Sequence, residues 1–399
     1  MTEHEQSFRI GVGTAHISPK AIAYVNDVLR SKRLSYGPYM MRFENRFAKE
    51  HGSKYAIMSN SGTSALHIAI AALKEIHGWK DGDEVIVPAV TFIATSNVVL
   101  HNGLRIKFVD IDPQYYELDP TKLEAAITPQ TRAIIPVHLF GQPADMNPIM
   151  RIAKKHNLKV IEDSCETMFA TYHGTPVGAL GDIGCFSTYI AHLITTGVGG
   201  LNTTNNSGYA VKLRSIMNHG RDNIYMSIDD DDNKSTEEMK MIIARRFSFV
   251  TLGHSFRATE MEGALGLAQV ENWKPIINKR RENAAHLTEK LSAASDSIQL
   301  PQIRPLTQHS FMMYPIVLLR EKKERLVHYL ETKGIETRDM LPLTNQPVYK
   351  KLLGIKEENY PVAKWINESG FYVGCHQDLG KTEINHIAES IKDGLRLIQ

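Results

Sequence analysis

Short apolar runs alternate with helix-like patterns along the first half of the chain, and this alternation is the strongest constraint on its fold. The apolar runs lie at 55–58, 84–90, 105–112, 132–137 and 158–163. Strands that alternate with helices form βαβ units, in which parallel strands make a sheet that helices cover on both faces. We therefore predict an α/β fold with a mostly parallel central sheet, which binds its ligand at the carboxyl ends of the strands.

The pattern changes near residue 270, and this change predicts a second, smaller α+β domain. A long charged helix begins there and leads into a proline-containing loop at 298–309. An apolar strand pattern at 311–319 follows, with helical patterns near 323–333 and 381–397. Pro19 after Ser18 is typical of a helix start. The predicted parts are an N-terminal arm (1–20), a large domain (21–269) and a small C-terminal domain (270–399).

Composition excludes several classes of function. The 399 residues are 42% hydrophobic, which suffices for about two domains with buried cores. A net charge of +2 indicates neither nucleic acid nor a membrane surface as partner. The polar start is unlike a signal peptide, and no apolar run reaches the roughly 20 residues that span a bilayer. We expect a cytoplasmic protein.

Neither the cysteines nor the acidic residues predict a metal site. Cys165, Cys185 and Cys375 are widely spaced and form no CxxC pair, so neither a disulfide framework nor a zinc site is indicated. The acidic tract at 227–240 is interpreted as a solvated surface insertion, with a metal-binding loop as the alternative.

Polar residues with potential chemistry follow the predicted strands. The stretch "SNSGTSAL" (59–66) opens a helix, where backbone amides and hydroxyls make an anion cradle, although an ordinary Ser/Thr N-cap explains it equally well. Asp163 ends a strand, and a buried carboxylate there needs a donor or a cation, as a structural ion pair would also provide. "GVGG" (197–200) is by itself more typical of a turn.

Taken in order, the motifs resemble those of one family over nearly the whole chain. They are "SNSGTSALHIAI" (59–70), "VPAVTFIATSNVV" (87–99), "KFVDIDP" (107–113), "PVHLFGQPADM" (136–146), "VIEDSCETMFATYHG" (160–174), "GDIGCFSTY" (181–189), "GVGGLNTT" (197–204), "LRSIMNHGRD" (213–222) and "LGHSFRATEMEGALGLAQV" (252–270). The sequence resembles the DegT/DnrJ/EryC1/StrS sugar aminotransferases, which use pyridoxal phosphate (PLP). The resemblance implies the type I aminotransferase fold of PLP-dependent enzymes.

The resemblance also implies the cofactor contacts. Gly62, Thr63 and Ser187 would hold the cofactor phosphate, and Phe92 would stack on the pyridine ring. Asp163 would pair with the pyridinium nitrogen. A carboxylate at that point keeps the ring nitrogen protonated, and the protonated ring then acts as an electron sink.

Further residues are expected near the sugar substrate. The segment "GHSFRA" (253–258) matches a loop that in this family reaches the partner subunit's site, so a homodimer with sites at the interface is expected. Within it, Ser255 stands where the family usually has Asn. We also predict substrate contacts from His219, Arg221 and His376, against the plain interpretation that these residues cap loops or pair with acids.

A histidine, His192, stands where the aminotransferases of this family have the lysine that forms a Schiff base with PLP. Imidazole cannot form a Schiff base, but its ordinary pKa of about 6.5 suits proton transfer at neutral pH. The nearest lysines, Lys159 and Lys212, lie in other segments. The cofactor is therefore expected to be bound without a covalent bond. Outside this motif context, His192 would be interpreted as an ordinary loop histidine.

Two further positions resemble the 3-dehydratase branch of the family, the GDP-4-keto-6-deoxy-D-mannose 3-dehydratases. Glu166, predicted to lie at the cofactor, occupies a position where the aminotransferases usually carry Gln or His. The pair His376–Gln377 in "FYVGCHQDL" (371–379) is also similar. An engineered Lys-to-His change at position 192 would not bring these residues along. A related CDP-sugar 3-dehydrase carries an iron–sulfur cluster on four cysteines, which this chain cannot supply.

These resemblances imply a nucleotide-sugar 3-dehydratase of deoxysugar and lipopolysaccharide O-antigen biosynthesis. Glutamate would convert PLP to pyridoxamine phosphate (PMP). His192, as base and acid, would then assist the loss of the C-3 hydroxyl from an NDP-4-keto-6-deoxy sugar. Two alternatives stay open: an aminotransferase-like enzyme that makes an NDP-amino sugar without a covalent lysine, and a catalytically inert relative. The sequence leaves the nucleotide and the sugar undetermined.

Overall fold

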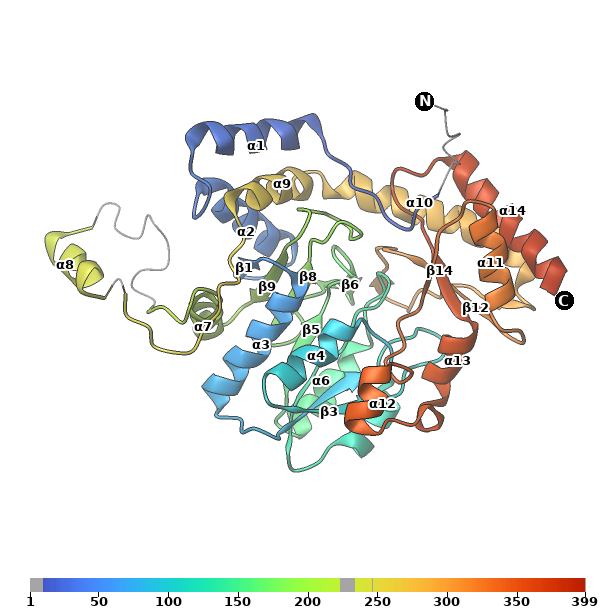
Figure 1. The fold of residues 1–399 in the computed structure, drawn as a ribbon, viewed down its shortest axis with the longest axis horizontal. Coiled ribbons are helices and arrows are strands. Elements are labelled where there is room, and N and C mark those ends of the chain that lie inside the picture. Colours follow the sequence, from blue (N-terminus) through green and yellow to red (C-terminus); the bar gives the residue numbers. More distant parts are fainter. Residues whose placement is uncertain (1–9, 223–233, 246, 399) are drawn as a thin grey trace.

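A seven-stranded sheet lies at the centre of the computed structural model, which describes residues 10–222, 234–245 and 247–398 (Figure 1). The strand order is β1-β9-β8-β5-β4-β2-β3, and β9 alone among these seven runs against the others. The predicted α/β fold with a mostly parallel sheet is therefore confirmed. The strands are β1 (Tyr55–Ser59), β2 (Glu84–Pro88), β3 (Arg105–Val109), β4 (Thr131–Ile134), β5 (Lys159–Asp163), β8 (Ile183–Ser187) and β9 (Gly200–Thr204).

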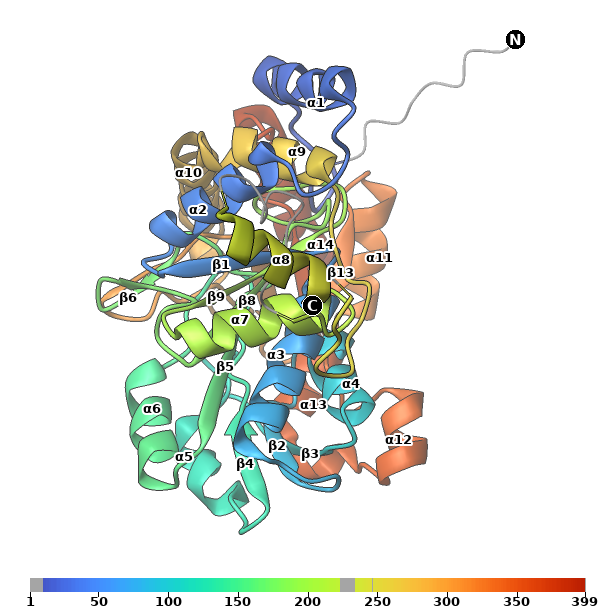
Figure 2. The ribbon, with the colours of Figure 1, turned by 90° about the vertical axis from the view of Figure 1, so that its left-hand side faces the viewer.

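Helices cover both faces of this sheet, as βαβ connections require. Figure 2 shows α3, α4 and α7 on one face and α5 and α6 on the other. Alternate residues of a strand point to opposite faces, so Cys185 packs in the core beneath α3, whereas Phe186 contacts Phe47 of α2 on the other face. The helices are α2 (Pro38–Glu50), α3 (Gly62–His77), α4 (Ile93–His101), α5 (Pro120–Leu123), α6 (Met146–Lys155) and α7 (Ser207–Met217).

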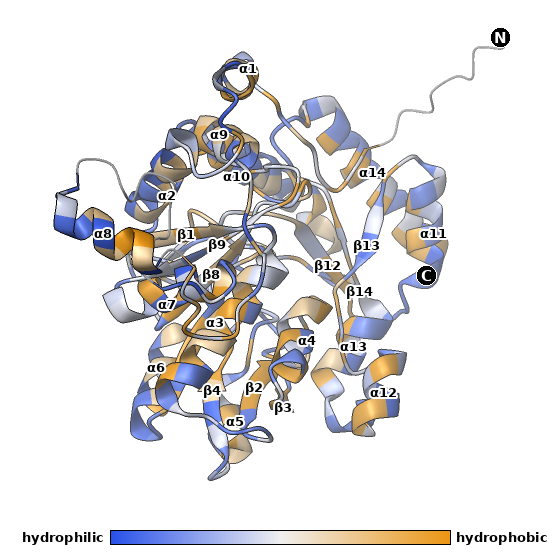
Figure 3. Ribbon diagram, turned by 60° about the vertical axis from the view of Figure 1, so that its left-hand side comes forward, coloured by the Kyte–Doolittle hydropathy of each residue, from blue (hydrophilic) through white to orange (hydrophobic). Residues whose placement is uncertain are grey.

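Hydrophobic residues are concentrated in the central sheet and in the helices that pack against it. Figure 3 shows them in β2 and in α3 and α4, which lie against it. The first turn of α3 and the residues just before α4 lie at the carboxyl ends of β1 and β2. The sheet and its helices thus bring the ends of β1, β2, β5 and β8 together at one edge, where the sequence predicts the ligand site.

A second, four-stranded sheet has the order β10-β12-β14-β13, with antiparallel pairs throughout. The sequence predicted β12 and the helices α11 and α14, but not β13 and β14, which are too short to give an alternating pattern. The boundaries at residues 20 and 270 stay predictions. The elements are β10 (Ile298–Gln299), β12 (Tyr314–Leu318), β13 (Thr337–Asp339), β14 (Gly370–Val373), α10 (Trp273–Leu291), α11 (Glu324–Thr332), α12 (Pro347–Leu353), α13 (Pro361–Ser369) and α14 (Lys381–Ile398).

The remaining elements connect or extend these two sheets. A small sheet of order β11-β6-β7 joins a loop near residue 307 to the segment after β5. Residues 223–233 of the acidic region lie outside the described residues, and the tract continues into α8. These elements are β6 (Thr171–Tyr172), β7 (Thr175–Pro176), β11 (Thr307–Gln308), α1 (Pro19–Ser31), α8 (Thr236–Arg245), α9 (Glu260–Val270), η1 (Glu124–Ala126), η2 (Ser292–Ala294) and η3 (Glu357–Asn359). Across the described residues, each helix is too short or too polar to cross a bilayer.

The segment before α1 contacts both the residues just before β13 and the loop between β8 and β9. As predicted, α1 begins after Ser18, whose hydroxyl accepts a 3.2 Å hydrogen bond from the amide of Ala21. Further upstream, Ile10 exchanges backbone hydrogen bonds with residues 334 and 336. Gly13 then lies against Ala191, since a Cβ on Gly13 would be 3.1 Å from the Cα of Ala191. The N-terminal segment thus packs against the loop that carries His192.

Candidate active site

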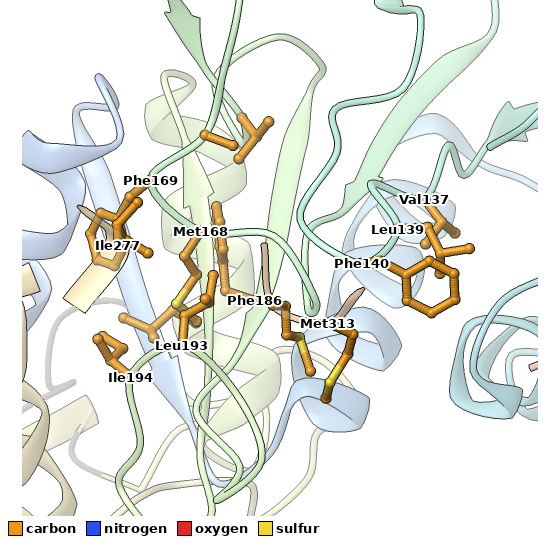
Figure 4. Close-up of a cluster of buried hydrophobic side chains, with 14 of the residues drawn as sticks. Val137, Leu139, Phe140, Met168, Phe169, Phe186, Leu193, Ile194, Ile277 and Met313 are labelled. Carbon is orange, nitrogen blue, oxygen red and sulfur yellow. The ribbon is translucent and has the colours of Figure 1, made fainter. Parts of the chain in front are cut away.

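His192 lies in the loop that connects β8 to β9, and the surrounding packing fixes its position. Its Nδ1 atom lies 3.0 Å from the carbonyl oxygen of Ser187. A carbonyl only accepts, so Nδ1 carries the hydrogen and Nε2 is the basic nitrogen of the neutral ring. The next two residues, Leu193 and Ile194, are buried in the core, and Figure 4 shows Leu193 beside Met168.

The surroundings of His192 favour its neutral form. Burial lowers the pKa of the imidazole, backbone groups of Ser187 and Cys165 raise it, and the charge of Arg280 lowers it, which together give a pKa of about 4. At neutral pH the ring therefore carries no charge and has a basic nitrogen available.

Asp163 ends β5 as a buried carboxylate with no cation within ion-pair distance among the described residues. Its Oδ2 accepts a 2.7 Å hydrogen bond from the hydroxyl of Thr95, and its Oδ1 accepts a 3.1 Å bond from the amide of Cys165. Burial raises its pKa, because the ionised form loses its hydration. A protonated pyridine nitrogen would supply the missing positive partner, so this residue fits a PLP ring.

The start of α3 forms a cradle with the end of β8. The hydroxyl of Ser61 accepts a 3.0 Å hydrogen bond from the amide of Ser64, so Ser61 is the N-cap that the alternative interpretation required. The amides of Gly62 and Thr63, in the same turn, have no acceptor within the helix. A Cβ on Gly62 would lie 2.6 Å from the Cβ of Ser187. This close approach and the free amides fit a phosphate group.

Phe92 and Glu166 are the two remaining predicted cofactor residues. Phe92 precedes α4, and its side chain is 55% exposed, which is unusual for phenylalanine and leaves a ring face free for stacking. Glu166 accepts a 3.2 Å hydrogen bond from the amide of Phe140. Burial raises the pKa of Glu166, the bond from Phe140 lowers it and the negative charge of Asp163 raises it, which together give a pKa of about 7. The carboxyl group of Glu166 is thus partly protonated near neutral pH.

The two lysines nearest to His192 in the sequence are engaged elsewhere. Nζ of Lys159 lies 3.1 Å from Asp182, and Nζ of Lys212 lies 2.6 Å from Glu75. The first pair joins the start of β5 to the residue before β8, and the second joins α7 to α3, so neither lysine lies in the β8–β9 loop. Neither lysine therefore takes the place of the missing Schiff-base residue.

The predicted substrate residues fall into two groups. The amide of His219 donates to the carbonyl of His254, and Ser255 pairs with residue 218, so His219, Arg221 and Ser255 lie on two paired segments. The Arg257 guanidinium donates a 2.8 Å hydrogen bond to the hydroxyl of Ser255. His376 lies apart from them, buried on the loop after β14.

Sequence reasoning missed several residues of this site. Thr95 bonds Asp163, and Thr91 bonds Thr95 at 2.8 Å. A spacing of four residues at a helix start was the available signal, but hydroxyl residues at such positions are common as caps. Arg280 lies within a charged helical pattern that predicts exposure, yet its side chain is fully buried.

Comparison with known proteins identifies the family of the chain. The sequence model of the DegT/DnrJ/EryC1/StrS aminotransferase family matches residues 15–392. The chain is 34% identical to GDP-perosamine synthase of Caulobacter vibrioides, over 96% of this chain and 97% of that protein.

Two solved structures have the same fold. One is Escherichia coli GDP-4-keto-6-deoxy-D-mannose-3-dehydratase with bound hydrated PLP, with a TM-score of 0.87 and 29% identity over 97% of this chain and all of that one. The other is GDP-4-keto-6-deoxymannose-3-dehydratase with a trapped PLP-glutamate geminal diamine, with a TM-score of 0.85 and 29% identity over 96% of this chain and all of that one. The chain therefore belongs to the DegT/DnrJ/EryC1/StrS family of PLP-dependent sugar-modifying enzymes, which includes both aminotransferases and dehydratases.

Proposed function

We propose that the protein is a nucleotide-sugar 3-dehydratase that removes the C-3 hydroxyl of an NDP-4-keto-6-deoxy sugar. The observation that carries this proposal is His192, a neutral imidazole in the β8–β9 loop at the position of the aminotransferase lysine. Imidazole transfers protons but cannot hold PLP covalently. The solved dehydratase structures, with their similar fold, support the proposal.

The cofactor would be held by non-covalent contacts alone. Asp163 would bind the ring nitrogen, the amides at the start of α3 and the Ser187 hydroxyl would bind the phosphate, and Phe92 would cover the ring. When bound, the cofactor supplies an electron sink for the bond changes at the sugar. With no lysine at position 192, these side chains would hold the cofactor by the same non-covalent contacts in its PLP and PMP forms.

His192 would act first as base and then as acid. It would take up a proton at the C4′ carbon of the cofactor and would give a proton to the hydroxyl that leaves from C-3. A histidine with a pKa of about 4 loses an acquired proton readily, because burial and Arg280 disfavour the imidazolium. The low pKa therefore favours transfer to the departing hydroxyl and disfavours the preceding proton uptake.

Glutamate is the proposed amino donor, and the overall reaction balances with it. Glutamate becomes 2-oxoglutarate and ammonia, which requires one oxygen atom, and the sugar loses one oxygen atom from C-3. The sugar is reduced by the two electrons that glutamate gives up. No further oxidant or reductant is needed, and the products are a 3-deoxy ketosugar, 2-oxoglutarate and ammonia.

Exposed apolar side chains in two segments of the chain support a homodimer. Large apolar side chains that gather on a surface commonly mark a protein–protein interface. Two groups contribute, one in the β8–β9 loop and one before α9: Tyr189, Ile190, Val198, Phe247, Phe249, Val250 and Leu252. A second copy that covers them would bring its own loop at 253–258 close to the cofactor site.

An aminotransferase that makes an NDP-amino sugar is the second candidate, favoured by the 34% identity to GDP-perosamine synthase. The two reactions share substrate and donor but differ in the fate of the nitrogen. Dehydration releases one ammonia for each sugar consumed, whereas transamination leaves an amino group at C-4.

Product analysis tests the proposal. The purified protein is incubated with PLP, glutamate and GDP-, CDP-, UDP- or dTDP-linked 4-keto-6-deoxy sugars, followed by mass spectrometry and an ammonia assay. A product without the C-3 oxygen, formed with stoichiometric ammonia, is expected. A product that keeps this oxygen and gains an amine would show transamination instead.

A further inference from the structure

Two buried threonines form a chain of hydroxyl groups that ends at the carboxylate of Asp163. Thr91 Oγ1 lies 2.8 Å from Thr95 Oγ1, and Thr95 Oγ1 lies 2.7 Å from Asp163 Oδ2. All three side chains are at most 3% exposed. An ionised carboxylate only accepts hydrogen bonds, so Thr95 donates to Asp163. The hydroxyl of Thr91 must then donate to Thr95, and the chain has a single direction.

The carboxylate of Asp163 is held from both sides. Thr95 binds its Oδ2, and the amide of Cys165 binds its Oδ1 at 3.1 Å. Two donors on different oxygens fix the plane of a carboxylate more firmly than one, and they also stabilise its charge in the absence of a cation. Asp163 is thereby oriented before any ligand arrives.

The same short segment places the predicted ring-stacking residue. Phe92 lies between Thr91 and α4, and Thr95 is in the first turn of that helix, where its amide bonds the carbonyl of Phe92 at 3.2 Å. The amide of Thr91 bonds the carbonyl of Leu341, which lies after β13. The segment that carries Phe92 and the hydroxyl chain is thus anchored to the loop after β13 as well.

We propose that Thr95 is a positioning residue, which orients Asp163 toward the ring nitrogen of PLP, and that Thr91 orients the hydroxyl of Thr95. This inference concerns cofactor binding and holds for a dehydratase or an aminotransferase. Its test uses no sugar and no amino donor, so its failure is distinguishable from failure of the proposed function.

The test compares Thr95→Val with Thr95→Ser in the full-length protein, using PLP labelled with ¹⁵N in the ring. Valine keeps the shape but removes the donor, and the bond that it removes lowers the pKa of Asp163. A higher pKa of Asp163 draws the shared proton from the ring nitrogen to the carboxylate. We expect PLP to bind about tenfold or more weakly. The ¹⁵N resonance should also move toward that of unprotonated pyridine.

Thr95→Ser keeps the hydroxyl but lacks the methyl group. It should show the wild-type affinity and resonance. If Thr95 acted only through the packing of its methyl group, Thr95→Ser would not show the wild-type values. Ser96→Ala is the matched control, because Ser96 is buried on the same helix but bonds Tyr349 and the carbonyl of Ile93. It should lower thermal stability without changing the ¹⁵N resonance.

Thr91→Val provides a second route if Thr95→Val does not fold. It leaves the bond between Thr95 and Asp163 in place but removes the group that orients it, so a smaller change in the same direction is expected. The wild-type affinity and resonance in Thr95→Val would overturn the proposal. If only Thr91→Val folds, wild-type values in that variant would overturn it equally.

Discussion

The Nε atom of Arg280 donates a 3.0 Å hydrogen bond to Oε1 of Gln377, which joins the long helix α10 to the loop after β14. The guanidinium also bonds the carbonyl oxygens of Phe311 and Met312 through Nη1. It is fully buried and has no carboxylate within ion-pair distance among the described residues. Its charge lowers the pKa of both His192 and His376. The positive charge of buried Arg280 therefore acts on His192, the proposed proton carrier.

Replacement of Arg280 should change stability and the acidity of His192 separately. Arg280→Met removes the donor to the side chain of Gln377 and to the carbonyl of Met312. The carbonyl of Phe311 keeps a hydrogen bond from the thiol of Cys375. We therefore expect a loss of about 2 kcal/mol in the free energy of unfolding, measured with urea. The loss of the charge should raise the pKa of His192, measured from its ring proton resonance. Arg280→Lys keeps the charge and should keep the low pKa. Lys279→Met, on the same helix, is the control for a lost surface charge. An unchanged pKa in Arg280→Met would contradict this account.

His192→Asn should separate cofactor binding from turnover. The asparagine side-chain amide can still donate to the carbonyl of Ser187, so the loop should keep its shape and the variant should bind PLP. Asparagine transfers no proton, and we expect the rate of sugar turnover to fall about 10²- to 10⁴-fold. Equilibrium dialysis and a single-turnover assay measure the two quantities. A variant that kept the full rate would show that another group carries the proton.

The sequence predicted the central sheet well because its strands are buried on both faces and flanked by helices. The predicted runs at 55–58 and 158–163 match β1 and β5 nearly residue for residue. The second sheet was predicted only in part, since β13 has three residues and gives no periodic signal. Short edge strands take their structure from their neighbours, so local sequence alone does not specify them.

Parts of the candidate site could be predicted from motifs. A histidine at the lysine position and an aspartate at a strand end were identified from motifs, and the structure brings Gly62 and Ser187 together. Thr95 and Arg280 were missed because their importance depends on partners from distant segments. The burial of Arg280 follows from residues 311, 312 and 377, which no helical periodicity reveals.

Glu166 and His192 should affect stability with opposite dependence on pH. The pKa of Glu166 rises from 4.5 to about 7 on folding, so the folded state binds more protons between these values and loses stability as pH rises through them. Glu166→Gln removes this loss, and we expect it to gain about 1–3 kcal/mol over the wild type as pH increases from 4.5 to 7. Urea unfolding of the cofactor-free protein at several pH values measures the difference. A constant difference across this range would refute the shifted pKa.

For His192 the sign is reversed. Its pKa falls from 6.5 to about 4 on folding, so the unfolded state binds more protons between these values. The wild type therefore loses stability as pH falls from 6.5 to 4. His192→Asn cannot take up a proton and should lose less stability over the same range. The same unfolding series detects this, with His156→Asn as a control, because His156 lies on the surface beside Glu124. Parallel pH curves for the wild type and His192→Asn would rule out the lowered pKa.

Gly62→Ala should weaken cofactor binding through one added methyl group. The new Cβ would lie 2.6 Å from the Cβ of Ser187, so the first turn of α3 must move away from the end of β8. Because the free amides of that turn form the proposed phosphate cradle, we expect the affinity for PLP to fall at least tenfold. Gly208→Ala is a matched control near the start of α7, where the nearest atom is 3.2 Å away on the side chain of Asn206. Equal affinities of the two variants would argue against a phosphate site at Gly62.

Leu252→Arg should disrupt the proposed homodimer. The side chain of Leu252 is 96% exposed and lies next to the segment at 253–258 that is expected to reach the partner's site. An unpaired arginine charge buried in the interface would cost far more free energy than the burial of Leu252 there contributes. Sedimentation velocity should therefore show monomers at protein concentrations where the wild type is dimeric, together with weaker PLP binding. Leu397→Arg, an exposed position near the end of α14, should leave both properties unchanged. If Leu252→Arg stayed dimeric, the interface would have to lie elsewhere on the molecule.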